Sequence, residues 1–314
     1  MLEILNFTAP VFILLLLGFI SVKSGYFKDK GIDGIGLYVF NIATPVLLFH
    51  TLSSLDIGRF FDIGMIAGYF TAVFINYLLV FTFMSKVRKL GLRESVASCV
   101  GGTFSNSVLV GIPLITSYMG VEKASPLFIL IAFHAPILLS MAAIGMSLAD
   151  HSNDRTKLVD RLKVIFFDLV KNPIIISILL GLSWNFLDFE LSGWPEELLG
   201  KISKTAGPTA LFAVGASLTR YKLSHSLTDV AFLTLFKLVI FPLLVFTFVY
   251  VILQVPEDLA KIAVIVASLP AGVNSYLIAI YYQTGASINS GTIFLSTTIS
   301  MFTLPFVLFL LEIY

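Results

Sequence analysis

The stretch "SLPAGVNSYLIAI", residues 268–280, places proline, glycine, asparagine and serine in the middle of an apolar run long enough to cross a bilayer. A transmembrane helix needs about 20 apolar residues, and an unsatisfied backbone group in lipid costs several kcal/mol. A break at this depth is tolerated only where it is buried in protein or lines a polar cavity. The stretch therefore predicts a discontinuous helix that faces the interior of a membrane protein.

The whole chain has the composition of an integral membrane protein. Its 314 residues are 57% hydrophobic and 12% charged, and its mean hydropathy is +0.96. The apolar runs are continuous, which favours helices over the alternating strands of a barrel. The predicted fold is all-α, with no room for a soluble domain and with ten transmembrane helices, centred near Leu15, Ala43, Ala72, Ser107, Ala135, Leu179, Ala210, Pro242, Leu269 and Thr298.

The basic residues indicate how these helices are oriented. The loops after helices one, three, five and seven hold 13 lysines and arginines, whereas those after helices two, four and eight hold three. By the positive-inside rule, both termini lie on the non-cytoplasmic side of the cell membrane. Glu3 precedes the first run where a signal peptide would be basic, so that run is expected to remain as helix one. A net charge of +1 argues against a nucleic-acid partner.

The chain also repeats itself. "APVFILLLLG" at 9–18 resembles "NPIIISILLG" at 172–181, and "SNSVLVGI" at 105–112 resembles "VNSYLIAI" at 273–280. These and further landmarks occur in the same order, with an offset that drifts only from 163 to 169 residues. Such self-similarity is typical of transporters built by duplication.

The repeat divides the chain into three parts. Residues 1–148 form a first five-helix repeat, 149–171 a short charged cytoplasmic linker, and 172–314 a second five-helix repeat. Because five is odd, the second copy must insert upside down relative to the first. The predicted architecture is therefore a five-plus-five inverted repeat, as in many secondary transporters.

Helix four carries the counterpart of the opening break, in "GGTFSNSVLVGIP" at 101–113. The polar residues of both breaks are types that cap helix N-termini, and two helix N-termini near the midplane would form an anion site. Pro270 frees an upstream carbonyl, and Gly272 allows the two backbones to approach closely. The alternative is that small polar residues simply pack helices together. The predicted substrate-binding residues in these breaks are Ser105, Asn106, Ser107, Pro270, Gly272, Asn274 and Ser275.

Other polar residues within the spans are weaker candidates. Lys237, in "LFKLVIFPLLVF", is predicted to act as counter-ion to an anion or as proton carrier, with snorkelling to the interface as the alternative. His134 in helix five is a candidate for proton coupling, against a single interhelical hydrogen bond. Asn41 and Thr44, next to the helix-breaking Pro45, are predicted to line the pocket.

Motifs for chemistry are missing from the sequence. It contains no G-x-x-x-x-G-K-[ST], H-E-x-x-H, C-x-x-C or G-x-S-x-G. We therefore expect no cofactor, no metal and no enzymatic activity. An intramembrane enzyme would need a nucleophile beside a base, and Ser107 with His134 is the nearest such pair by depth.

Several of these segments together resemble the auxin efflux carrier family, which includes plant auxin carriers and prokaryotic permeases for malonate and related acids. The resemblance covers nearly the whole chain, and the segments that carry it are "NIATPVLLFHTL", "GTFSNSVLVGIPLITSYMG", "LFKLVIFPLLVF" and "ASLPAGVNSYLIAIYY".

This resemblance implies a scaffold and a transport domain that moves as an elevator, a substrate site where helices four and nine cross, and often a homodimer. Asn106 and Asn274, with Pro113 and Pro270, match the family's crossover residues, and Lys237 matches its helix-eight lysine. Asp62 aligns less closely with an acidic residue of the plant carriers' coupling region. The cytoplasmic linker is far shorter than the plant loop, which favours a prokaryotic carrier of small organic acids over an auxin carrier.

The sequence thus predicts a secondary transporter of small organic anions. One alternative is a sodium-coupled symporter resembling the bile-acid family, although no carboxylate lies beside the breaks to hold sodium. A channel or a ligand sensor is an alternative from another class.

Overall fold

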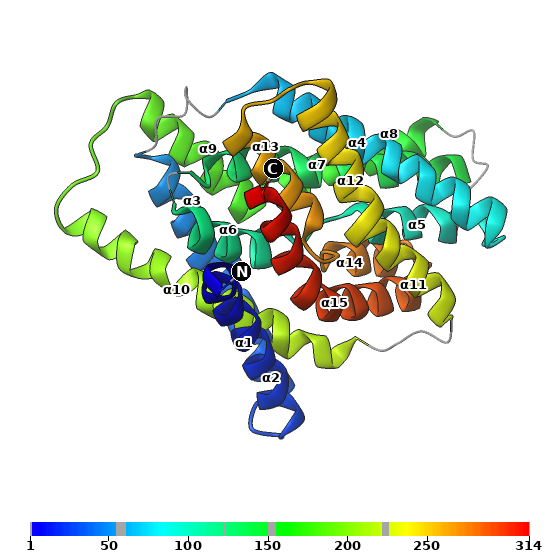
Figure 1. Cartoon of the computed structure of the whole chain (residues 1–314), viewed down its shortest axis with the longest axis horizontal. Coiled ribbons are helices and arrows are strands. Elements are labelled where there is room, and N and C mark those ends of the chain that lie inside the picture. Colours follow the sequence, from blue (N-terminus) through cyan, green and yellow to red (C-terminus); the bar gives the residue numbers. More distant parts are fainter. Residues whose placement is uncertain (1, 55–60, 122, 150–154, 222–225, 314) are drawn as a thin grey trace. The chain divides into compact units, whose positions relative to one another are not determined.

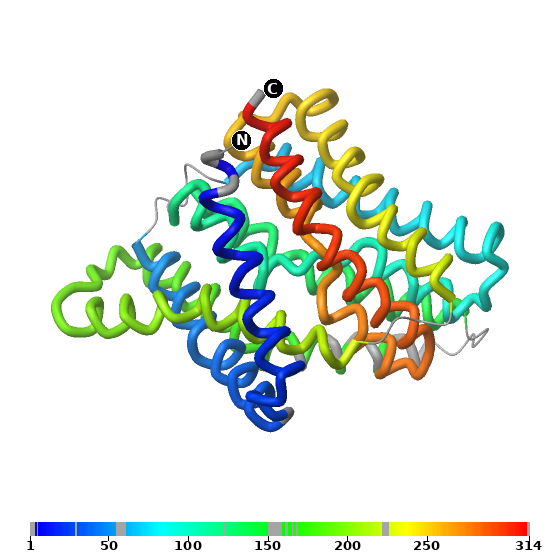
Figure 2. The backbone as a smooth tube through the Cα atoms, turned by 60° about the horizontal axis from the view of Figure 1, so that its bottom comes forward, coloured from blue at the N-terminus to red at the C-terminus, as the bar shows by residue number. Residues whose placement is uncertain are grey.

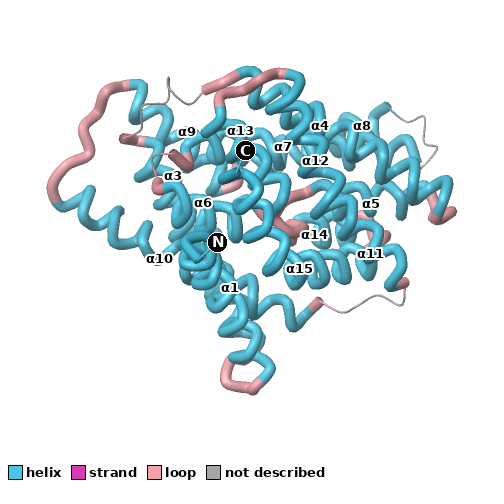
Figure 3. The backbone as a smooth tube through the Cα atoms, in the orientation of Figure 1, coloured by secondary structure: helices cyan, strands magenta, loops and turns pink. Residues whose placement is uncertain are grey.

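The computed structural model describes all residues except 1, 55–60, 122, 150–154, 222–225 and 314, and these described residues are helical throughout, apart from turns and loops (Figure 3). Their one pairing of the β type is an isolated bridge between Ser105 and Ala271. The helices are α1 (Leu2–Lys23), α2 (Asp29–Tyr38), α3 (Thr44–Leu52), α4 (Ile63–Thr82), α5 (Leu92–Thr103), α6 (Ile112–Met119), α7 (Ser125–Ala149), α8 (Arg155–Val170), α9 (Pro173–Phe186), α10 (Trp194–Ser217), α11 (Leu227–Leu235), α12 (Phe241–Phe246), α13 (Glu257–Ser268), α14 (Asn274–Tyr281) and α15 (Ala286–Ile313).

Six helical segments in the described part are long and apolar enough to cross a membrane: Asn6–Lys23, Lys30–Leu52, Ile63–Val87, Ser125–Ala149, Leu227–Ile252 and Ala286–Glu312. Large apolar side chains point outward from them, including Ile13 (54% exposed) and Phe302 (76%), as expected for surfaces that face lipid. The all-helical membrane fold is therefore confirmed. The count of ten spans and their inverted repeat stay predictions.

Short π-helical turns connect several helices: η1 (Val39–Ala43), η3 (Phe83–Val87), η4 (Ser107–Gly111), η6 (Phe236–Ile240) and η7 (Thr247–Ile252). Three of them, η1, η4 and η6, end two residues before a proline, namely Pro45, Pro113 and Pro242. Proline has no N–H and its ring crowds the carbonyl four residues back, so the helix widens to i→i−5 hydrogen bonds. The Thr44 N–H, for example, donates to the Val39 carbonyl.

The chain folds into two compact units that interleave along the sequence. Unit 1 comprises residues 1–61, 107–132 and 169–220, and unit 2 comprises residues 62–106, 133–168 and 221–314. These units reflect which residues pack together, whereas the predicted repeat reflects similarity between two halves of the sequence. The units therefore do not test the predicted repeat boundaries at residues 148 and 172, which stay predictions. Residues 150–154 of the predicted linker lie outside the described residues, and α8 forms most of its remainder.

Unit 1 is organised around the contact of α1 with α10, which lie side by side in Figures 1 and 2. Glycines allow the two backbones to touch. A Cβ on Gly18 would lie 2.1 Å from the Phe212 carbonyl oxygen, and a Cβ on Gly215 would lie 1.8 Å from that of Leu15. Similarly, a Cβ on Gly181 in α9 would lie 2.9 Å from Leu52 Cβ in α3. Gly18 and Gly181 close the two matching motifs of the predicted repeat.

Replacing Gly215 with leucine is expected to lower the free energy of unfolding by about 3 kcal/mol or more, because α1 and α10 must separate to admit a side chain. Thermal unfolding in detergent would measure the loss. Gly36→Ala is the matched control, since a Cβ at this helical glycine meets no atom within 4 Å and should change stability by about +1 kcal/mol at most. Equal stabilities for the two variants would contradict the close packing of α1 on α10.

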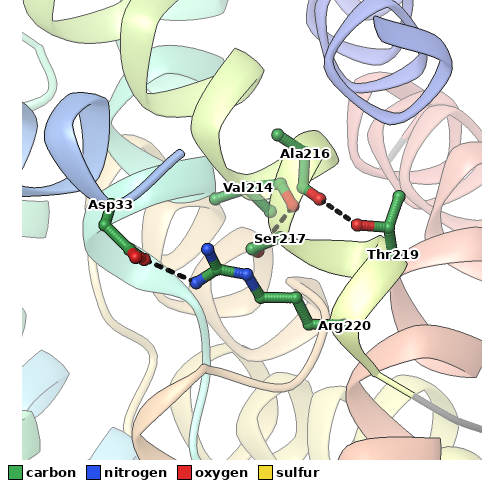
Figure 4. Close-up of polar contacts among 6 residues, drawn as sticks. All are labelled: Asp33, Val214, Ala216, Ser217, Thr219 and Arg220. Atoms are coloured by element: carbon green, nitrogen blue, oxygen red, sulfur yellow. Dashed lines mark hydrogen bonds and ion pairs between the residues drawn. The ribbon is translucent and has the colours of Figure 1, made fainter. Parts of the chain in front are cut away.

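Polar contacts secure the end of α10 in unit 1. The Arg220 guanidinium donates to the Asp33 carboxylate over 2.6 Å, while the hydroxyls of Ser217 and Thr219 donate to the carbonyls of Val214 and Ala216 (Figure 4). Because these hydroxyls bond within their own helix, the end of α10 needs no other polar partner for them.

Unit 2 contains α4, α5, the later part of α7, most of α8, and α11 to α15. Within it α15 packs along α11 and α13, and the red α15 runs beside the yellow α11 in Figure 2. Arg88, just after η3, pairs with buried Asp229 over 2.5 Å, and Arg93 donates to the Tyr282 carbonyl over 2.9 Å. These two arginines join helices of the first half of the chain to helices of the second half.

Candidate functional site

Two helices of unit 2 stop short of their expected length, and the segments that follow them pair with each other. α5 ends at Thr103 and α13 ends at Ser268. The Asn106 N–H donates to the Pro270 carbonyl over 2.9 Å, and the Gly272 N–H donates to the Phe104 carbonyl over 2.8 Å. The two breaks are therefore held as a short antiparallel pair centred on Ser105 and Ala271.

The residues of the second break explain its geometry. Pro270 cannot donate a hydrogen bond, so helix α13 cannot continue through it. A Cβ on Gly272 would lie 2.8 Å from the Phe104 ring and 3.1 Å from the Ser105 carbonyl oxygen. Glycine is thus required for the close approach, as the sequence predicts.

The amides of Ser105 and Ala271 point away from the pair and need partners elsewhere. In an antiparallel pair bonded through the flanking residues, the central residues direct their own N–H groups outward. The Ser105 N–H donates to His134 Nε2 in α7 over 3.0 Å, and the Ala271 N–H donates to Ser296 Oγ in α15 over 3.0 Å. Both acceptors are buried.

The carbonyls at the ends of α5 and α13 also receive side-chain donors. Asn76 Nδ2 in α4 donates to the Gly102 carbonyl over 2.9 Å, and Lys237 Nζ in η6 donates to the Ala267 carbonyl over 2.6 Å. These carbonyls lie where a continuous helix would have supplied backbone N–H groups. Each break therefore has one side-chain donor and one side-chain acceptor.

The supports of the two breaks correspond across the chain. Equivalent residues of the two breaks are separated by 161 to 166 positions in the sequence. The pairs are the bonded carbonyls at 102 and 267, the central amides at 105 and 271, the donors at 76 and 237, and the acceptors at 134 and 296. Sequence reasoning missed Asn76 and Ser296. Their separations from Lys237 and His134, 161 and 162 residues, lie just outside the offset of 163 to 169 residues seen in the sequence, so that offset does not point to either residue.

Lys237 does not snorkel, so that alternative is wrong. Its side chain is fully buried, and Nζ lies 5.0 Å from the centre of the Phe241 ring in addition to its bond to Ala267. Within the described part of the chain, Lys237 takes part in no ion pair. A buried ammonium without a carboxylate partner is a functional candidate.

The predicted N-terminal caps of α14 are wrong. Val273 occupies the cap position of α14 without a side-chain hydrogen bond, and Asn274 is the first helical residue. The Ser275 hydroxyl donates backward to the Gly272 carbonyl over 2.8 Å. The amides of Ser275 and Tyr276 also turn back, to the carbonyls of Gly272 and Val273. Fewer free N–H groups therefore remain here for an anion than the sequence suggested.

Asn106 and Ser105, in the first break, each have a buried side-chain polar atom without a hydrogen-bond partner among the described residues, and Asn106 is the one in which that atom is an amide donor. Asn106 is 5% exposed, and its Nδ2 has no hydrogen-bond partner among the described residues. Buried amide groups are nearly always paired, so such a donor is available to a ligand. Ser105 is 1% exposed, and Asn274, on the other break, is half-buried.

The remaining predicted site residues fall in different places. Asn41, Thr44, Ser107 and Pro113 belong to unit 1, where Thr44 is buried and Asn41 is exposed within η1. Asp62 begins unit 2 and caps α4, accepting from the Met65 N–H over 2.6 Å. This cap accounts for Asp62 locally, and its role in coupling stays a prediction.

A separate cavity of about 380 Å³ lies among residues of α4, α5 and α7, including Phe74, Val96 and Met141. Its lining is almost wholly apolar and contains none of the predicted site residues. Tyr77 brings the one side-chain hydroxyl among its lining residues, and no charged side chain lines it to bind an organic acid. Among the described residues, no group of three or more His, Cys, Asp or Glu side chains forms a metal site.

Three known proteins resemble this chain over 94% or more of its length. The chain is 23% identical over 312 residues to "Putative malonate transporter" of Rhizobium meliloti, covering 99% of this chain and 97% of that protein. It is 26% identical over 301 residues to "Uncharacterized transporter" of Methanothermobacter thermautotrophicus, covering 94% of each. It is 23% identical over 361 aligned positions to "Auxin efflux carrier component 8" of Arabidopsis thaliana, covering 99% and 98%. The profile of the family described as "Membrane transport protein" matches residues 4–308, and the chain therefore belongs to that family.

Proposed function

We propose that this protein is a secondary transporter of small organic anions, with its substrate bound beside the paired breaks of unit 2. The observation that carries the proposal is the pairing of two broken helices beside the buried side-chain amide of Asn106, whose Nδ2 has no hydrogen-bond partner in the described part of the chain. Broken helices at membrane depth are the usual binding sites of secondary transporters. The names of two relatives refer to malonate and to auxin, which are both carboxylic acids, and this supports an anionic substrate.

Two polar groups give this site its preference for carboxylates. The side-chain amide of Asn106 supplies N–H donors. Lys237 supplies a positive charge close to the second break, because its Nζ bonds the carbonyl of Ala267, three residues before Pro270. An ammonium buried without a carboxylate is costly, and an anionic substrate would offset that cost. Asn274 and Ser275, on the facing segment, complete the proposed lining.

The inverted repeat is part of the same proposal. The matched supports of the two breaks favour duplication, as do the matched glycines Gly18 and Gly181. In an inverted repeat, exchanging the conformations of the two halves opens the substrate site to either side in turn. We propose that unit 2 carries the substrate and moves against unit 1 as an elevator, in a homodimer of the cell membrane with both termini outside.

Counter-flow in proteoliposomes tests the proposal. Vesicles preloaded with unlabelled malonate are expected to accumulate labelled malonate transiently, because a carrier exchanges substrates through one alternating site. Malate and indole acetate, each as its own labelled pair, would show which acid is preferred. Protein-free vesicles are the control. Absence of accumulation for every acid, with protein shown to be folded, would contradict the proposal and favour a channel or a sensor.

Sodium coupling is a second candidate that the same assay decides. Sodium sites use oxygen ligands, and the backbone carbonyls of the breaks are a possible source of them. We expect malonate exchange to persist when potassium replaces sodium, since no carboxylate is among the residues of the two breaks. Loss of exchange in potassium would favour the symporter. The proposal makes the protein a transporter and not an enzyme, in agreement with the names of its relatives.

A further inference from the structure

The two outward-pointing amides of the breaks depend on one side chain each. Ser105 and Ala271 form the centre of the antiparallel pair, and both are buried. Water cannot replace a lost partner at such a position without a polar cavity. His134 Nε2 and Ser296 Oγ are the acceptors that the structure supplies.

Hydrogen bonding defines the protonation state of His134. Because Nε2 accepts from the Ser105 N–H, that nitrogen carries no proton. The proton of the neutral ring is then on Nδ1, which lies 3.3 Å from the Tyr69 hydroxyl oxygen and donates to it. The Phe104 ring packs edge-on against the imidazole, with centroids 4.8 Å apart. His134 is therefore held by a residue of α4 while it supports the first break.

The hydrogen bond between Ser105 and His134 lies close to the points where the chain passes between the two units. The chain passes from unit 2 to unit 1 between residues 106 and 107, and returns between residues 132 and 133. Ser105 and His134 belong to unit 2, and each lies one residue inside the boundary residue, Asn106 or Phe133, at these two crossings. Their hydrogen bond ties together the two points at which the segment 107–132 leaves and re-enters the unit.

We infer that His134 and Ser296 are equivalent positioning residues, which fix the substrate-binding segments 104–106 and 269–273 by accepting the Ser105 and Ala271 amides. His134 acts as a neutral acceptor and carries no proton across the membrane. This inference rests on the proposed function for its link to substrate, whereas the positioning itself can be measured without any substrate.

Ser296→Ala removes one acceptor and is the first variant. The Ala271 amide then lacks a partner, and hydrogen exchange in segment 269–273 is expected to accelerate about fivefold or more. Ser300→Ala is the matched control, because Ser300 is equally buried in α15 and bonds only the Thr297 carbonyl of its own helix. Exchange equal in the two variants would overturn the role of Ser296.

His134 is tested by two substitutions that differ in their acceptor. Glutamine can place an oxygen near the Nε2 position, and leucine cannot. His134→Leu is expected to accelerate hydrogen exchange in segment 104–106 about fivefold or more and to raise the KM for malonate by a similar factor, with His134→Gln close to the parent. Equal damage from both variants would overturn the acceptor role.

The pH profile separates positioning from proton coupling. The titratable side chains that act on His134 within the described residues are Tyr69 from α4 and Lys237 from η6. Since glutamine does not titrate, a positioning role predicts the same profile of transport against pH in His134→Gln as in the parent. Loss of the pH dependence in this variant would show that His134 carries the proton and would overturn the inference.

Nitrogen NMR tests the tautomer without transport. The chain has four histidines, so ¹⁵N-histidine labelling gives few signals, and His134→Gln assigns the one that disappears. The neutral Nδ1–H form is expected at pH 7. An imidazolium or the Nε2–H form would overturn the inference even if malonate is not the substrate. His50→Gln is the control for labelling and folding.

Discussion

Replacing Asn106 with alanine is expected to lower malonate exchange at least about tenfold, while the free energy of unfolding stays within about 0.5 kcal/mol of the parent. The reason is that the Asn106 Nδ2 is buried but bonds no described residue. Its removal therefore costs the protein no hydrogen bond of its own. It costs the substrate a hydrogen bond to a charged oxygen, which is worth about 1.5–3 kcal/mol.

The contrast with Asn76 makes this prediction specific. Asn76 is equally buried, and its Nδ2 bonds the Gly102 carbonyl and the Thr103 hydroxyl. Asn76→Ala should therefore lower stability as well as transport. Asn106→Asp should abolish exchange more completely than alanine, because a carboxylate repels an anionic substrate. Asn6→Ala, on the exposed face of α1, is the neutral control. Unchanged exchange kinetics in Asn106→Ala would remove Asn106 from the site.

Replacing Lys237 with methionine is expected to reduce exchange about a hundredfold or more and to lower the free energy of unfolding by about 1–3 kcal/mol. Methionine fills a similar volume but cannot donate, so the Ala267 carbonyl at the end of α13 is left unpaired. The same change removes the positive charge that the substrate carboxylate needs. Unfolding in detergent and counter-flow measure the two effects separately.

Lys237→Gln separates the donor from the charge. Its amide can still donate to the Ala267 carbonyl, so stability should recover most of the loss seen in Lys237→Met. Transport should stay low, because the neutral side chain offers no counter-charge to the anion. Full recovery of transport in Lys237→Gln would contradict the counter-ion role and leave Lys237 as a support of the break. Lys261→Gln, one turn into α13 where the lysine pairs with Glu257 over 2.6 Å, is a control for the loss of one lysine.

Several features of this protein follow from its sequence alone. Uninterrupted apolar runs require helices, because no other segment can satisfy its own backbone in lipid. Proline, glycine and polar residues within such a run predict a break, and both predicted breaks are present, near 104–106 and 269–273. Pro45, Pro113 and Pro242 likewise act locally, each just after a π-helical turn. These are effects of neighbouring residues on one another, which a single sequence records.

Only the tertiary structure decided what each polar side chain does. Asn274 is a residue type that often caps helices, but in the structure Val273 occupies the cap position of α14 and Asn274 is the first helical residue. Lys237 could snorkel by length, but it bonds a carbonyl 30 residues along the chain. Asn76 and Ser296 carry no local signal, because their partners lie 26 and 25 residues away. A hydrogen bond depends on atoms that folding brings together, so the sequence determined where the helices break and the tertiary structure determined what holds the breaks.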